Sequence, residues 1–212
     1  MSEDGNRRRN TAANPRRAKP EDAYALSQLF AAAFSDDPVV DWTVRIGPKR
    51  AVALQEFFFR VMRDRAIPAG EVWMSDDGTT CAAWLPPGVP LQPRGFFEQL
   101  RLFPMFLRLC GVARLKYGAA TSAAMEKNHP RERHFYLLFM AVAPPLQGKG
   151  LGSAILQATL KRADELRLPA YLENSNPKNT RLYERAGFVA RGNILPEGPP
   201  LIAMWREVNT AK

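Results

Sequence analysis

A glycine-rich loop between an apolar strand and a helix restricts the fold of this chain most strongly. Residues 147–152 read Gln-Gly-Lys-Gly-Leu-Gly, after an aromatic and aliphatic run from His134 to Val142 and before a helical pattern from Ser153 to Leu166. Glycines let a backbone approach a ligand closely, and a helix that begins there directs N–H groups and the positive end of its dipole at the loop. The pattern predicts a phosphate-binding turn in an α/β domain.

The order of residues in this loop excludes two common nucleotide-binding motifs. A P-loop has GxxxxGK followed by Ser or Thr, whereas Lys149 is followed by Gly150. The dinucleotide fingerprint GxGxxG requires a third glycine where Ser153 stands, and it lies early in a βαβ unit rather than late in a chain. The loop therefore belongs to another class of phosphate site.

Hydrophobic periodicity predicts an alternation of helices and strands over the rest of the chain. A helix start is indicated where Asn176 precedes Pro177, because asparagine caps a helix and proline suits its first position. The predicted helices cover 20–34, 49–65, 153–166 and 176–187, and the predicted strands cover 71–75, 80–85, 134–142, 171–173, 188–194 and 201–208.

Residues 86–130 carry a separate helical pattern. Apolar side chains recur at spacings of three and four from Phe96 to Cys110. Packing of this stripe against the core is the default expectation, and a partner or an acceptor molecule is the alternative. The segment is therefore read as a helical insertion.

The first nineteen residues differ in composition from the remainder. They hold six arginines and lysines against two acidic residues, without apolar periodicity, in a chain of net charge +9. This composition predicts a disordered basic tail over residues 1–19 and a single domain over residues 20–208. Such a tail can bind nucleic acid, but a solvated terminus is the ordinary outcome, so a nucleic-acid partner is not expected.

Composition argues against several other classes of function. Cys81 and Cys110 are too few for a disulfide framework, and His129 and His134 form no zinc-binding pattern, so no metal is expected. The chain shows neither a secretory signal nor an apolar run of membrane-spanning length. We therefore expect a soluble cytoplasmic protein without a membrane partner.

The loop is Gln-x-x-Gly-x-Gly after a strand that ends Val-x-Pro, and this resembles the acetyl-CoA loop of the GNAT N-acetyltransferase superfamily. A second segment, Leu172-Glu173-Asn174-Ser175-Asn176-Pro177-Lys178-Asn179 leading into Leu182-Tyr183-Glu184-Arg185-Ala186-Gly187-Phe188, is similar to the matching GNAT motif. The resemblance is closest to puromycin N-acetyltransferase-like members, through residues 32–38, 70–73, 76–78 and 196–199. That group suggests a role in antibiotic resistance.

The resemblance implies a particular fold and an acyl donor. The GNAT fold has a mixed central sheet, flanked by helices, whose fourth and fifth strands splay apart. It places acetyl-CoA between those strands, uses no metal, and assigns the insertion around 86–130 to the acceptor site. By the same match, the cofactor-binding residues are Met140, Ala141, Val142, Gln147, Gly148, Lys149, Gly150, Leu151, Gly152, Ser153, Asn179 and Tyr183.

Two residues are the predicted catalytic groups. Tyr183 is the candidate acid, since a phenol keeps its proton at neutral pH and can donate to a leaving thiolate. Glu173 is the candidate base, directly or through water, because burial would raise its pKa. The alternatives are a packed tyrosine that closes the helix onto the sheet and a carboxylate that caps or pairs. An aspartate at position 36 or 37 could instead supply the base.

The candidate substrate-binding residues are Asp36, Asp37, Trp42 and Trp84, because carboxylates attract an ammonium group and indoles stack on rings. Asp36-Asp37-Pro38 is equally typical of an ordinary turn. The function expected is acetyl transfer to a primary amine of a small molecule, such as an aminonucleoside antibiotic or an amino-acid-like metabolite. The alternatives are a protein N-terminal or lysine acetyltransferase and a non-catalytic acyl-CoA sensor. Either a monomer or a homodimer is consistent with the sequence.

Overall fold

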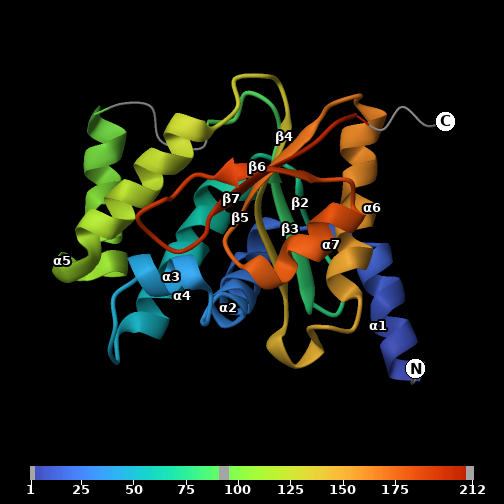
Figure 1. Cartoon of the computed structure of the whole chain (residues 1–212). Helices are drawn as coiled ribbons and strands as arrows, with labels where there is room; N and C mark the ends of the chain where they lie inside the picture. The colour runs from blue at the N-terminus through green and yellow to red at the C-terminus, as the bar shows by residue number, and fades with distance from the viewer. Residues whose placement is uncertain (1–2, 91–95, 209–212) are drawn as a thin grey trace.

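A seven-stranded mixed sheet with the order β1-β2-β3-β4-β5-β7-β6 organises the chain (Figure 1). The computed structural model describes residues 3–90 and 96–208. The strands are β1 (Arg16–Arg17), β2 (Val72–Met74), β3 (Thr80–Leu85), β4 (Phe135–Val142), β5 (Ala170–Asn174), β6 (Val189–Asn193) and β7 (Ile202–Arg206). The α-helices are α1 (Glu3–Ala13), α2 (Ala23–Ala33), α3 (Pro38–Thr43), α4 (Arg50–Val61), α5 (Phe96–Asn128), α6 (Leu151–Glu165) and α7 (Thr180–Arg185).

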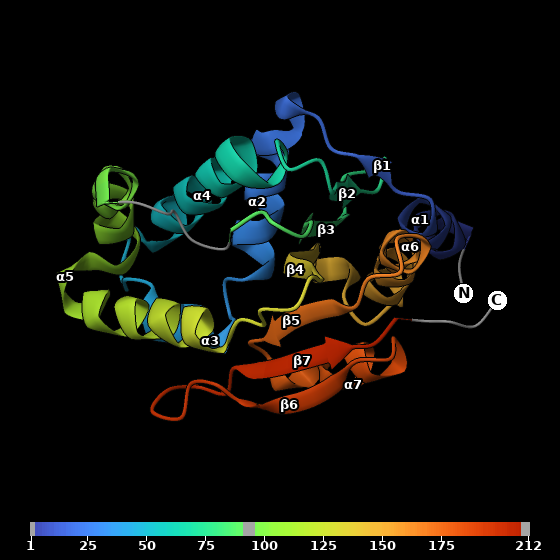
Figure 2. The same cartoon turned by 90° about the horizontal axis from the view of Figure 1, so that it is seen from above.

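Helices cover both faces of the sheet (Figure 2). Strand β3 is buried along its whole length, and its side chains alternate between two apolar clusters. Cys81 and Ala83 pack in the cluster of α2 and α4, whereas Ala82 and Trp84 pack in the cluster of α6. This double coverage explains why residues 81–85 are apolar throughout rather than alternating.

The splay between β4 and β5 is confirmed. These strands run parallel and pair only at Phe135 with Ala170 and at Tyr136 with Tyr171. Strand β4 then continues to Val142 along β3, while β5 continues along β7. The two strands therefore diverge after two paired positions, as the resemblance implied for the fourth and fifth strands of the fold.

A β-bulge in β4 lies where the strands part. Ala83 pairs with Phe139 and Trp84 pairs with Leu137, so Leu138 has no opposite residue on β3. A bulge bends its strand and increases the local twist. The bend directs the second half of β4 away from β5.

Residues 3–19 do not form the disordered tail that their composition predicts. They form helix α1, which packs beside α6 with Ala12 fully buried, and strand β1, which pairs with β2. The sequence of this segment shows no apolar stripe that would predict a helix. The helix is stabilised instead by burial of Ala12 and by tertiary contacts with α6. The domain of the described residues begins at α1 rather than at Pro20.

The insertion around 86–130 contains helix α5, although residues 91–95 lie outside the described residues. The helix is interrupted at Gly111, whose φ of 65° is non-helical. Leu109 and Cys110 are buried in the core, whereas Leu100 and Phe103 are exposed. The expectation that the whole stripe packs on the core is therefore wrong for its first part.

Candidate active site

The glycine loop connects the end of β4 to α6 and has the backbone that the sequence predicts. Gly148 and Gly150 have φ values of 74° and 83°, which favour glycine. The first helical bond runs from the N–H of Ala154 to the carbonyl oxygen of Gly150 at 3.1 Å. The N–H groups of the three preceding residues, Leu151, Gly152 and Ser153, are the unpaired donors of the helix start, where phosphate oxygens bind.

A side-chain hydrogen bond of the exposed Gln147 ties the loop to β4. Its Nε2 donates to the carbonyl oxygen of Val142 at 3.2 Å, so the side chain folds back over the end of β4. Lys149 and Gly148 are exposed, and the Leu151 side chain is buried in the core. Of the residues predicted to bind phosphate, those at the helix start therefore offer backbone N–H groups, and Gln147 ties the turn to the end of β4.

Beyond Tyr136, β4 and β5 are separated by a gap, and the edge of β4 that faces this gap carries backbone groups that do not pair with β5. Ala143 donates its N–H to Thr79 at 2.9 Å, on the β3 side of the strand. Because backbone groups alternate in direction along a strand, those of Ala141 face β3 and those of Met140 and Val142 face the gap. Met140 and the N–H of Val142 thus present groups that an extended molecule would pair with, whereas the carbonyl oxygen of Val142 accepts from Gln147 and the groups of Ala141 face β3.

Gly152 lies where β4, α6 and α7 meet. A methyl group placed on it would lie 3.5 Å from Val142 Cγ2 and 3.7 Å from Leu182 Cδ2. The start of α6 therefore packs directly on the end of β4 and on α7. This contact brings the glycine loop to the helix that carries Tyr183.

Tyr183 is enclosed beside the gap. Its side chain is 8% exposed, and its ring meets Phe188 edge-on at 6.1 Å between centroids. The phenol has no hydrogen-bond partner within the described residues. Burial raises the pKa of Tyr183, and the negative charge of Asp37 raises it further. The hydroxyl is therefore protonated at every physiological pH.

Asp37 caps helix α3 and is tied to the chain after β5. Its Oδ1 accepts from the N–H groups of Val39 and Val40 at 2.9 and 3.1 Å, and its Oδ2 accepts from Ser175 Oγ at 2.6 Å. Burial raises the pKa of Asp37, against the opposing effect of these hydrogen bonds. Both oxygens are engaged, so Asp37 is a structural cap that acts on Tyr183 by its charge. Asp36 is exposed.

Glu173 lies on the opposite face of the sheet from Tyr183. Its Oε2 accepts a hydrogen bond from the hydroxyl of Tyr136 at 2.6 Å, and its Oε1 is buried without a partner among the described residues. Burial raises the pKa of Glu173 to about 7, although the bond from Tyr136 opposes the shift. A carboxyl group with this pKa can both accept and release a proton near neutrality.

A cavity lies near Glu173 on the same face. It has a volume of about 220 Å³ and is lined in part by Tyr171, Arg131 and Arg191. Tyr171 shares the face of Glu173 because the two residues alternate with Leu172 along β5. The cavity therefore lies beside Tyr171 rather than at the carboxyl group of Glu173.

The two tryptophans predicted to bind substrate differ in burial. Trp42 on α3 is partly exposed, and its ring centroid lies 4.2 Å from that of Tyr117 on α5. Trp84 is 2% exposed under α6, where its Nε1 donates to Thr159 Oγ1 at 3.1 Å. The prediction that Trp84 binds substrate is wrong, since the alternation along β3 directs it into the core.

The Trp84→Phe variant tests this correction. We expect its free energy of unfolding to fall by about 1–2 kcal/mol, because a buried hydrogen bond and part of a packed ring are lost. The Michaelis constant for the acceptor should be unchanged. Chemical denaturation and steady-state kinetics measure the two effects, and an altered acceptor constant at unchanged stability would contradict the core assignment.

The Gly150→Ala variant tests the loop. A side chain at a φ of 83° is strained, so we expect the turn to relax and acetyl-CoA affinity to fall by about tenfold. Gly88→Ala is the matched control, since Gly88 has a φ of 90° and open space around it, near the opposite end of β3. Calorimetry on both variants should show loss only for Gly150→Ala, and equal affinities would refute the assignment of the loop.

Sequence reasoning missed three contributors to this site: Tyr136, Ser175 and α3. Asn176 caps its turn as predicted, accepting from Lys178 N–H at 3.1 Å, and Asn179 is exposed at the start of α7. The hydrogen bonds of Tyr136 and Ser175 join residues that are distant in sequence, so no local signal marks them. The proline after Asp37 is a helix-start signal that could have identified α3.

Two other kinds of feature are absent from the described part of the chain. None of its helices has the length and apolar character needed to cross a membrane. In the same residues, no three histidine, cysteine or acidic side chains are grouped as a metal site requires.

Comparison with known proteins gives a family match over the region that builds this site. The model of the Acetyltransferase (GNAT) family matches residues 90–188, which include β4, the glycine loop, α6, β5 and α7. An uncharacterised N-acetyltransferase of Schizosaccharomyces pombe is 26% identical over 208 residues, covering 92% of this chain and 83% of that relative.

Solved structures share the fold. A Corynebacterium glutamicum protein described as histone acetyltransferase HPA2 and related acetyltransferase has a TM-score of 0.68 and 24% identity, covering 93% of this chain and 97% of that one. An agmatine N-acetyltransferase has a TM-score of 0.57 and 15% identity, with coverages of 90% and 95%. At these identities the structures establish the common architecture, while the family match concerns the sequence itself.

Proposed function

Because this chain belongs to the GNAT family of acetyltransferases, we propose that it transfers the acetyl group of acetyl-CoA to the primary amine of a small molecule. The observation that carries the proposal is the gap between β4 and β5, with the glycine loop at one end and Tyr183 and Glu173 on its two faces. Acetyl-CoA supplies the thioester whose acetyl group is transferred.

The residues around the gap fit this donor. The helix-start N–H groups of Leu151, Gly152 and Ser153 suit its phosphates, since they are the unpaired donors of α6. The free backbone groups of Met140 and the N–H of Val142 suit the amides of an extended pantetheine arm, while the carbonyl oxygen of Val142 accepts from Gln147. The open loop around Gly148, where no atom lies within 4 Å of an added methyl group, leaves space for close backbone approach.

Proton transfer is divided between the two faces. A direct attack of the amine nitrogen forms the new C–N bond and breaks the C–S bond, so one proton must leave nitrogen and one must reach sulfur. We assign the first to Glu173, whose pKa of about 7 allows it to accept a proton, directly or through water. The sulfur leaves as a thiolate, to which the phenol of Tyr183 donates a hydrogen bond, and the thiolate of CoA takes its proton from solvent.

The acceptor site is proposed on the Glu173 face, between α3, α5 and the β6–β7 loop. Trp42 of α3 contacts Tyr117 of α5, and a methyl group on Gly198 of the loop would lie 3.2 Å from Trp42 Nε1. Three segments therefore meet around one indole, which favours a slender amine over a folded protein surface. The agmatine acetyltransferase with the same fold acts on such an amine, which supports this acceptor class.

A thiol-release screen tests the proposed function. Acetyl-CoA is mixed with the protein and with a panel that includes agmatine, a polyamine, an arylalkylamine, puromycin and a short peptide with a free N-terminus and a lysine. We expect at least one small amine to accelerate thiol release over buffer. Acceleration only by the peptide would favour protein acetylation, and acetyl-CoA binding without any acceleration would favour an acyl-CoA sensor.

A further inference from the structure

Helix α1 brings an arginine to the glycine loop. A methyl group placed on Gly150 would lie 3.9 Å from Arg9 Cζ and 4.0 Å from Arg9 Nε. The guanidinium group therefore lies over Gly150, the residue just before α6, next to the helix-start N–H groups. These two parts of the site are more than 140 residues apart in sequence.

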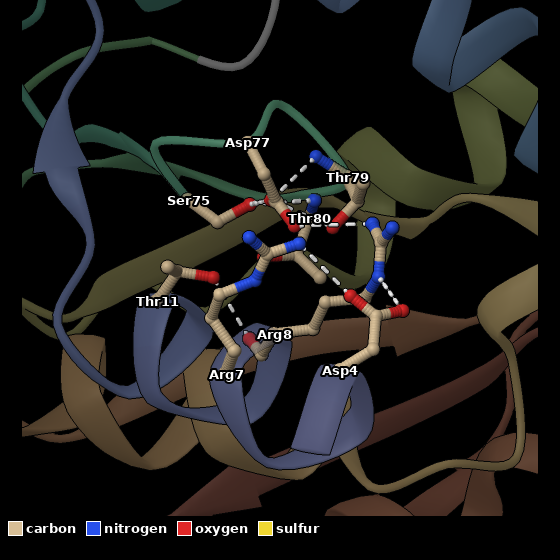
Figure 3. Close-up of polar contacts among 8 residues, drawn as sticks. All are labelled: Asp4, Arg7, Arg8, Thr11, Ser75, Asp77, Thr79 and Thr80. Atoms are coloured by element: carbon tan, nitrogen blue, oxygen red, sulfur yellow. Dashed lines mark hydrogen bonds and ion pairs between the residues drawn. The ribbon is translucent and has the colours of Figure 1, made fainter. Parts of the chain in front are cut away.

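Helix α1 is held firmly enough to position this side chain. Ala12 is fully buried in the cluster that contains Leu151 and Ile155 of α6. Arg8 reaches Asp77 of the β2–β3 turn at 3.4 Å, as Figure 3 shows. The segment after α1 then pairs with β2 through β1, so contacts secure the helix on its side and at its end.

The three consecutive arginines of α1 differ in their partners. Asp4 accepts hydrogen bonds from Arg7 at 2.9 Å and from Arg8 at 3.0 Å (Figure 3). No carboxylate within the described residues pairs with Arg9, and its side chain is exposed. The arginine that faces the loop is thus the one whose charge is left available.

We propose that Arg9 binds the pyrophosphate of acetyl-CoA, so that α1 forms a third side of the phosphate site beside the loop and α6. This inference rests on the proposed function. A guanidinium group presents donors in a planar fork that matches phosphate oxygens, and its full charge adds to the partial charge of the helix start. The basic N-terminal segment accordingly serves the anionic donor rather than a nucleic acid.

The test compares Arg9→Gln with Arg7→Gln by calorimetric titration of CoA. Arg7 is the matched control, because it lies on the same helix and pairs with Asp4 instead of facing the loop. We expect Arg9→Gln to weaken CoA binding by roughly 10- to 100-fold, the range for a hydrogen bond to a charged group. Arg7→Gln should bind like the wild type. Thermal unfolding of both variants verifies that α1 remains folded.

A second titration, with dephospho-CoA, identifies the phosphate that Arg9 contacts. Dephospho-CoA keeps the pyrophosphate and lacks the 3′-phosphate, so Arg9→Gln should lose the same factor for both ligands. A loss confined to CoA would overturn the pyrophosphate assignment, and wild-type affinity in Arg9→Gln would overturn any role of Arg9. Failure of the wild-type protein to bind CoA would instead refute the proposed function.

Discussion

Replacement of Tyr183 by phenylalanine lowers kcat by about 100-fold or more, while acetyl-CoA affinity remains close to that of the wild type. The ring keeps its edge contact with Phe188, so packing of α7 on the sheet is preserved. Only the hydroxyl is lost, and with it the donor to the departing sulfur. Steady-state kinetics give kcat, and calorimetric titration gives the affinity.

The raised pKa of Tyr183 determines how the phenol acts. Burial and the nearby charge of Asp37 favour the protonated form, so complete proton transfer to a thiolate is unfavourable. A hydrogen bond that strengthens as charge develops on sulfur requires no such transfer. We therefore expect the effect of Tyr183→Phe to be independent of pH from 6 to 9.

Tyr24→Phe serves as the control for this variant, because Tyr24 is 59% exposed on α2 and has no part in the site. It should leave kcat and affinity unchanged. An unchanged kcat in Tyr183→Phe would show that the tyrosine only closes α7 onto the sheet. That result would leave Glu173 and the backbone of β4 as the catalytic groups.

The parts of the fold that the sequence predicts are those whose signals are local. The loop at 147–152 has glycines where the backbone needs positive φ, and the apolar strand before it and the helical pattern after it are continuous in sequence. The Asn176-Pro177 helix start is similarly encoded by two adjacent residues. Such features depend on backbone preference and periodicity, which a single sequence contains.

The parts that the sequence does not predict depend on contacts between distant segments. Helix α1 reads as a polar tail because its stability comes from Ala12 against α6 and from Arg8 with Asp77. Trp84 is predicted to bind substrate, but the face to which a β3 side chain points depends on strand register, which the sequence of the strand alone does not give. The partners of Glu173 and Asp37 are likewise set by the assembly of the sheet.

Glu173→Gln should remove the pH dependence that this carboxyl group gives to catalysis. In the wild type, activity rises with pH through about 7, because Glu173 must lose its proton before it can accept one from the amine. The amide cannot accept that proton, so we expect a kcat about 100-fold lower at pH 8 and no change of kcat with pH around 7. Glu165→Gln, at an exposed residue of α6, is the control.

The same substitution predicts a change in stability with a definite sign. The pKa of Glu173 is about 7 in the folded protein and lies above the ordinary value of 4.5, so the native state binds a proton that the unfolded state has lost between these values. Wild-type stability therefore falls as pH rises through this window and is then level. Glu173→Gln should lack this fall and should be the more stable protein at pH 8, as measured by denaturant titration at several pH values. A variant with the wild-type pH profile in both assays would assign the proton to another acceptor and place the Glu173 carboxylate in solvent.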